Sequence, residues 1–109
     1  MKLVWTMEAI QKLEDIQYYL EVTQKAPEAA LAMVRRIILR VPKILNTPLA
    51  GHTVADYDDN QVRQVHENPY RIIYYVTEEV IYILSIMHHR QLIPNYKKIL
   101  AGVNEVTAD

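Results

Sequence analysis

Arginines and histidines gather in one stretch of this 109-residue chain, between residues 62 and 90. An arginine guanidinium is a planar fork suited to phosphate or carboxylate, and a histidine imidazole titrates near neutral pH. Together such groups can clamp a phosphate and move a proton, which is the chemistry that a metal-independent ribonuclease needs. The candidate residues are Arg63, His66, Arg71, His88, His89 and Arg90, with tyrosines such as Tyr75 beside them.

The same side chains also have a purely structural interpretation. Arg71 in mid-strand can pair with an acid such as Glu67, and adjacent histidines at a strand end are usually surface or partly buried residues. A zinc site at His88 and His89 is disfavoured, because neighbours on a strand point to opposite faces. We expect no metal and no cofactor.

Three apolar segments rich in Ile, Val and Tyr predict an antiparallel meander over residues 62–90. They are interrupted at Asn68-Pro69 and at Thr77–Glu79, where tight turns are expected. Side chains on strands are held rigidly and can be aimed, so chemistry or recognition is expected in this stretch.

The register of the meander decides which histidine accompanies Arg71. If Glu78 and Glu79 form a two-residue turn, Arg71 and His88 share one face of the sheet. A longer turn or a bulge would place His89 on that face instead.

Upstream of the meander, the pattern predicts a strand over Lys2–Trp5 and two helices. Thr6 is suited to cap a helix over about residues 7–22, whose apolar residues recur at helical spacing. Pro27 is suited to open the second helix. Pro42 should loosen the last turn of that helix, because proline cannot donate the backbone hydrogen bond.

The remaining segments are a loop over residues 46–61 and a C-terminal extension over residues 92–109. Pro94-Asn95 predicts the start of a short helix in that extension, and Gly102 its end. We expect the extension to cover the chain's own core, with occupation of a partner's groove as the alternative. The fold class is therefore α+β in a single domain, residues 1–109. Its elements are an N-terminal strand, a two-helix hairpin, a three-stranded meander in one sheet with the first strand, and a short C-terminal helix.

Composition excludes several functional classes. Cysteine is absent, which excludes disulfides and thiol chemistry. Twelve basic against thirteen acidic residues give a net charge of −1, so no bulk field attracts nucleic acid. The longest apolar run, residues 80–87, is too short to span a bilayer. We therefore expect a soluble protein with no membrane contact, for which a cytoplasmic location is allowed.

Six short motifs follow one another along the chain: WTMEA, APEAA, NTPLAGHTV, VRQV, PYRIIYYV and HHRQ. In this order they resemble the RelE/ParE superfamily of bacterial type II toxins over roughly residues 2–93, and more closely its ParE branch. The resemblance implies a toxin of a toxin–antitoxin, or plasmid stabilisation, system that causes growth inhibition. It also implies a cognate antitoxin that forms a hetero-oligomer with the toxin by wrapping around its helices and sheet.

Three functions are compatible with this resemblance. The first is a ParE-like toxin that binds and inhibits DNA gyrase without catalysis, for which we expect target contacts at Arg63, His66, Arg90 and Tyr75. The second is a RelE-like mRNA interferase, a metal-independent endoribonuclease acting on messenger RNA at the ribosome. The third is an inactive binding module of the same fold.

For the interferase, the resemblance assigns the scissile phosphate to Arg71 and proton transfer to His89 by spacing, with His88 as the other candidate. The loop over 46–61 lacks the lysines of the RelE branch, and Arg90 replaces a terminal tyrosine. These departures favour the gyrase inhibitor.

Overall fold

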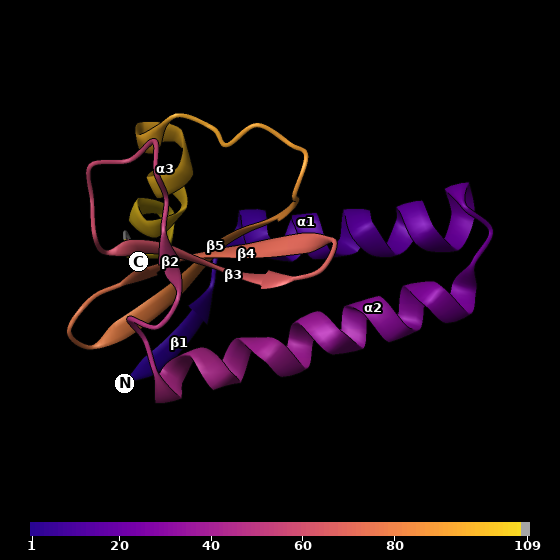
Figure 1. Cartoon of the computed structure of the whole chain (residues 1–109), viewed down its shortest axis with the longest axis horizontal. Coiled ribbons are helices and arrows are strands. Elements are labelled where there is room, and N and C mark those ends of the chain that lie inside the picture. The colour runs from indigo at the N-terminus through magenta and orange to yellow at the C-terminus, as the bar shows by residue number, and fades with distance from the viewer. Residues whose placement is uncertain (108–109) are drawn as a thin grey trace.

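The computed structural model describes residues 1–107 and has an α+β fold (Figure 1). One five-stranded sheet has the strand order β1-β5-β4-β3-β2, with a helical hairpin on one face and a C-terminal helix on the other. The elements in chain order are β1 (Lys2–Trp5), α1 (Met7–Tyr18), η1 (Tyr19–Thr23), α2 (Pro27–Arg40), η2 (Val41–Asn46), β2 (His52–Thr53), β3 (Val62–Glu67), β4 (Tyr70–Val76), β5 (Val80–His88) and α3 (Tyr96–Thr107).

The predicted meander is confirmed. Strands β3, β4 and β5 are antiparallel neighbours, and β1 adds to the outer side of β5 in parallel. The two-residue strand β2 was not predicted; it pairs antiparallel with β3 inside the segment that was expected to be a loop.

The helical hairpin follows its local signals. The Thr6 side chain accepts a hydrogen bond from the Ala9 backbone, which caps α1 as predicted. Helix α1 continues as one turn of π-helix, η1, to Thr23. Helix α2 begins at Pro27, as predicted, and next to Pro42 it gives way to the 3-10 helix η2. Pro42 was expected to loosen the last turn, but the turn there is tighter, because a 3-10 helix has fewer residues per turn.

Apolar side chains form a core on each face of the sheet. The hairpin-side core contains Ile16, Ile37, Ile72, Ile81 and Ile83 among others. The α3-side core contains Val54, Ile73, Tyr82, Leu84 and Ile99 among others. Strand β5 contributes to both cores, which explains why its sequence is almost continuously apolar.

Helix α3 covers the sheet face opposite the hairpin, which confirms that the C-terminal extension covers the chain's own core. The prediction that Gly102 ends the helix is wrong, since α3 continues to Thr107. A Cβ atom at Gly102 would lie 3.3 Å from the Thr6 Cβ atom. The glycine therefore provides close helix packing rather than a stop.

Candidate functional site

A β-bulge decides the geometry of the predicted site. Thr77 donates its backbone N–H to Val80 over 2.8 Å, so Glu78 and Glu79 form the two-residue turn. The register then shifts between Ile73 and Tyr74 of β4, and beyond the shift Arg71 lies opposite Met87. Arg71 therefore faces the α3 side of the sheet.

His88 faces the other side. Its cross-strand partner is Tyr70, which belongs to the hairpin-side core, and the two rings meet edge to face at 5.6 Å. A two-residue turn without a bulge would have placed Arg71 and His88 on one face of the sheet. The bulge shifts the register by one residue, so the two side chains face opposite sides.

His89 does not replace His88 beside Arg71, because β5 ends at His88. The His89 ring stacks on the His88 ring at 4.5 Å, and its Nδ1 lies 3.0 Å from the Pro69 carbonyl oxygen. Partial burial, His89 and Arg90 together lower the pKa of His88. The two histidines thus form one stacked pair beside the β3–β4 turn.

The Arg71 guanidinium contacts the chain itself. It donates to the backbone oxygen of Gln91 and lies 3.5 Å from the Gln64 side-chain oxygen. The buried Nε of Arg71 has no hydrogen-bond partner within residues 1–107. Glu67 does not pair with Arg71; it forms an ion pair with Arg36 on α2 at 3.5 Å. Arg71 therefore holds the segment that leaves β5.

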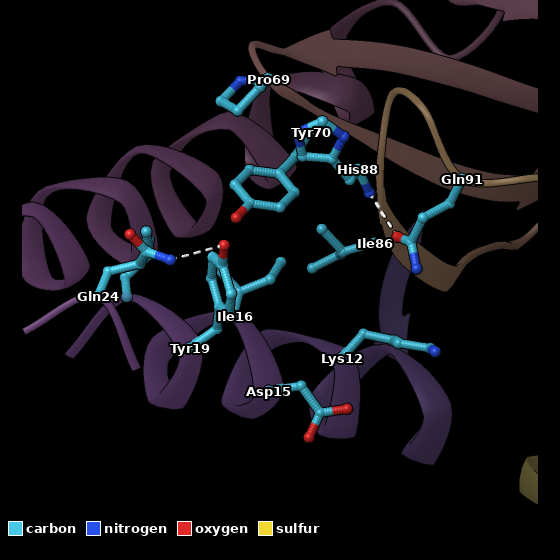
Figure 2. Close-up of a pocket in the computed structure, with 11 residues that line it drawn as sticks. Lys12, Asp15, Ile16, Tyr19, Gln24, Pro69, Tyr70, Ile86, His88 and Gln91 are labelled. Carbon is cyan, nitrogen blue, oxygen red and sulfur yellow. Dashed lines mark hydrogen bonds between the residues drawn. The ribbon is translucent and has the colours of Figure 1, made fainter. Parts of the chain in front are cut away.

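A cleft lies between the hairpin and the end of the sheet, on the side that His88 faces (Figure 2). It has a volume of about 580 Å³. Figure 2 shows Tyr70 and Ile86 from the sheet opposite Ile16 and Tyr19 from the hairpin. The cleft is lined by Lys12, Asp15, Ile16, Tyr19, Leu20, Gln24, Pro69, Tyr70, Ile86, His88 and Gln91.

Two hydrogen bonds fix side chains at the rim of this cleft. Gln24 donates to the Tyr19 hydroxyl over 2.8 Å, and the His88 backbone donates to the Gln91 side-chain oxygen over 2.7 Å. The Tyr19 bond spans the π-helical turn, a feature that often marks functional sites. The cleft thus combines an apolar floor with a preformed polar rim.

These observations can be set beside known proteins. Residues 3–93 match the family model described as the ParE toxin of the type II toxin-antitoxin system, parDE. The chain belongs to the ParE toxin family. A solved structure titled "Chromosomal ParDE TA system from P. aeruginosa" is 26% identical, with a TM-score of 0.64 over 81% of this chain and 95% of that chain. No curated protein matches.

This ParE toxin is accordingly the toxin component of a type II toxin–antitoxin system, with an antitoxin as its partner. Helix α3 begins at Tyr96, outside the matched residues 3–93. Within residues 1–107, no helix is both long enough and apolar enough to cross a membrane. In the same residues, no three potential ligand side chains of the His, Asp or Glu type meet in a metal-binding arrangement.

The Arg63 side chain is hydrogen-bonded to the loop before β3. Its guanidinium donates to the backbone oxygens of Asn60, Leu49 and Gly51 over 2.9 to 3.0 Å. Tyr74 on the neighbouring strand holds the same loop, because its hydroxyl donates to the Pro48 oxygen and accepts from the Gly51 backbone. Arg63 is thus a structural anchor in this ParE toxin.

The other three predicted target contacts differ in exposure. His66 is exposed opposite Arg71 in the register, and its ring lies 6.3 Å from that of His52. Arg90 is exposed in the turn after β5. Tyr75 is partly buried against the α3-side core, so only part of its side chain is available to a partner.

Sequence reasoning missed the cleft residues on the hairpin. Lys12, Asp15 and Tyr19 lie on one face of the hairpin's first helix, at a spacing of three and four residues. That spacing was visible, but it resembles an ordinary solvated helix face. Only the approach of β4 and β5 in three dimensions turns it into one wall of a cleft.

Proposed function

We propose that this ParE toxin inhibits DNA gyrase by binding it, without catalysing a reaction of its own. The observation that supports this proposal most is the separation of Arg71 from His88. A ribonuclease needs its phosphate-binding cation and its proton-transfer groups around one scissile bond. Here the two side chains face opposite sides of the sheet, and Arg71 donates to the toxin's own backbone.

A binding role makes smaller demands on the site. Exposed cationic or titratable side chains need only match the surface of the target, and His66 and Arg90 meet that condition. Gyrase acts on chromosomal and plasmid DNA, so the proposal implies a cytoplasmic location.

Neutralisation is assigned to the cleft. We propose that an antitoxin segment inserts an apolar side chain between Tyr19 and Tyr70, with polar groups at the rim beside Lys12, Asp15 and Gln24. An apolar floor with a polar rim fits a peptide of mixed character, which is how a groove recognises an amphipathic segment.

The first experiment compares DNA and protein synthesis just after the toxin is induced in cells. Thymidine incorporation should fall before methionine incorporation, and purified toxin should block supercoiling by gyrase. Arg71→Lys and His88→Ala should keep both effects, provided that urea unfolding shows them folded. The mRNA interferase would be favoured instead if methionine incorporation collapsed first and if either substitution abolished that collapse.

The cleft is tested separately with a matched pair of tyrosines. Tyr19 lines the cleft, whereas the adjacent Tyr18 is 63% exposed and does not line it. Tyr19→Ala should weaken binding of the purified antitoxin by about tenfold to a hundredfold, the usual effect of truncating an interface aromatic. Tyr18→Ala should leave the affinity unchanged. Equal losses in the two variants, measured by calorimetry, would assign the antitoxin to another surface.

A further inference from the structure

The polar groups of the cleft differ in character from one end to the other. Figure 2 shows Lys12, His88 and Gln91 at one end, and Tyr19 and Gln24 at the other. At the Lys12 end, the hydrogen bonds that these side chains already make show which of their polar atoms are still free. The free atoms determine what chemistry an occupant of that end must offer.

The His88 ring has one N–H that is free to donate. The Arg90 backbone N–H donates to the His88 Nδ1 over 3.2 Å, so Nδ1 holds a lone pair rather than a proton. In the neutral imidazole the proton is then on Nε2. Within residues 1–107, no group accepts a hydrogen bond from this Nε2–H. His88 is therefore a hydrogen-bond donor in the wall of the cleft.

Gln91 and Lys12 are donors as well. The Gln91 side-chain oxygen accepts from the His88 backbone over 2.7 Å, which leaves the NH₂ group of the same amide free to donate. The Lys12 ammonium has three N–H donors and no acceptor. Lys12 is partly buried and forms no ion pair in the part of the chain that the structure describes.

Asp15 does not neutralise this end of the cleft. It is the one acid among the described residues that line the cleft. Its Oδ1 accepts a hydrogen bond from the Gln11 side chain over 2.9 Å, and it does not form an ion pair with Lys12. The Lys12 end therefore combines one unpaired cation with two neutral donors.

We propose that the Lys12 end of the cleft binds the carboxylate of an aspartate or glutamate side chain of the antitoxin. This inference rests on the proposed binding of the antitoxin in the cleft and specifies the chemistry of the bound segment. Lys12, His88 and Gln91 donate to the carboxylate, whose two oxygens can accept about four hydrogen bonds. The apolar side chain between Tyr19 and Tyr70 then lies toward the other end of the cleft.

A phosphate group fits this end less well than a carboxylate. A phosphate group carries nearly two negative charges, and proteins usually bind it with arginine forks or clusters of cations. Among the described residues that line the cleft, Lys12 is the only cation at neutral pH. Arg71 faces the other side of the sheet. One cation with two neutral donors matches the single charge of a carboxylate.

The test is the affinity of the purified antitoxin for toxin variants, measured by calorimetry. Lys12→Met should raise the dissociation constant about tenfold, because it removes a charge-assisted hydrogen bond and keeps a long apolar side chain. Lys12→Arg keeps the charge and should retain most of the affinity. The urea midpoint of Lys12→Met should equal that of the wild type, because Lys12 forms no ion pair in the described chain.

Lys43→Met is the matched control for overall charge. Lys43 is exposed on η2 and does not line the cleft, so this variant loses the same charge elsewhere. At an ionic strength of about 0.15 M, exposed charges more than about 8 Å apart are largely screened, and the affinity should not change. A loss as large as that of Lys12→Met would overturn the proposal, because it would make the effect one of net charge.

A double-mutant cycle identifies the carboxylate. Each aspartate and glutamate of the antitoxin is replaced by asparagine or glutamine. One replacement should weaken binding to the wild-type toxin about tenfold and have little further effect on Lys12→Met, because the two groups form one pair. The proposal is overturned if no acidic side chain is coupled to Lys12. It is also overturned if Lys12 is coupled instead to the terminal carboxylate of the antitoxin, which a short C-terminal extension would displace.

Tyr19→Ala distinguishes a failure of this inference from a failure of the proposed binding in the cleft. If Tyr19→Ala weakens binding and Lys12→Met does not, the carboxylate assignment alone is wrong. If neither variant weakens binding, the antitoxin occupies another surface and both proposals are wrong.

Discussion

Replacing Ile99 tests whether α3 is an integral part of the fold. Ile99 is 2% exposed and packs in the α3-side core with Ile73, Tyr82 and Leu84 of the sheet. Truncating a buried isoleucine to alanine removes its transfer free energy and leaves a cavity, together about 2–5 kcal/mol. For 109 residues, a loss of about 3 kcal/mol corresponds to a fall in melting temperature of about 13 °C.

The control for this substitution lies in the same extension. Leu92 is 93% exposed, so Leu92→Ala should change the free energy of unfolding by less than about 0.5 kcal/mol. Both variants are compared by thermal unfolding followed by circular dichroism and by urea titration. If Ile99→Ala unfolds at the same temperature as Leu92→Ala, α3 is not packed on the sheet in solution. The C-terminal extension would then be available to a partner, as in the alternative that the sequence left open.

Three further predictions concern the cap, a glycine and a tyrosine. Thr6→Val should lower the free energy of unfolding by about 2–4 kcal/mol in urea titrations, because it removes the cap of α1 and a buried hydrogen bond to β5. Thr6→Ser should keep both interactions. Gly51→Ala should cost about 1–3 kcal/mol in the same assay, because its Cβ would lie 2.3 Å from the Tyr74 hydroxyl oxygen and strain the packing. The hydrogen bond to Asp59 raises the pKa of Tyr96 to about 12. The bond's contribution to the free energy of unfolding is therefore complete below about pH 10 and is lost as the pH rises from about 10 to about 12. Tyr96→Phe should show a smaller fall in melting temperature over that interval than the wild type, and an equal fall would contradict the assignment.

Local signals predicted most of the secondary structure. Pro27 opens a helix and Thr6 caps another, because each effect depends on the residue's own backbone or side chain. The turns at Asn68-Pro69 and Glu78–Glu79 are equally local. The sequence alone was therefore sufficient for the order of the main elements and for the fold class.

Features that depend on distant contacts were not predictable in the same way. Gly102 looks like a helix stop, but its role is to let α3 approach Thr6, which lies near the other end of the chain. The short strand β2 exists because Arg63 and Tyr74 fasten a loop without apolar periodicity to the sheet. Nothing in either local sequence indicates the remote partner.

The β-bulge shows how such a distant effect reaches the candidate site. Pairing between β4 and β5 runs in step from Val76 opposite Ile81 to Tyr74 opposite Ile83, and then resumes with Ile73 opposite Ser85, so Leu84 is the extra residue. Strand β5 is buried on both faces, so its sequence has no alternation that would locate the bulge.

One extra residue is enough to decide the chemistry. Without it, Arg71 would lie opposite Ile86 and share a face with His88. With it, Arg71 turns toward the C-terminal extension and donates to Gln91, while His88 turns toward the cleft. The two groups that a ribonuclease would need together thus face opposite sides of the sheet. This separation is the observation that supports the proposed action by binding rather than by cleavage.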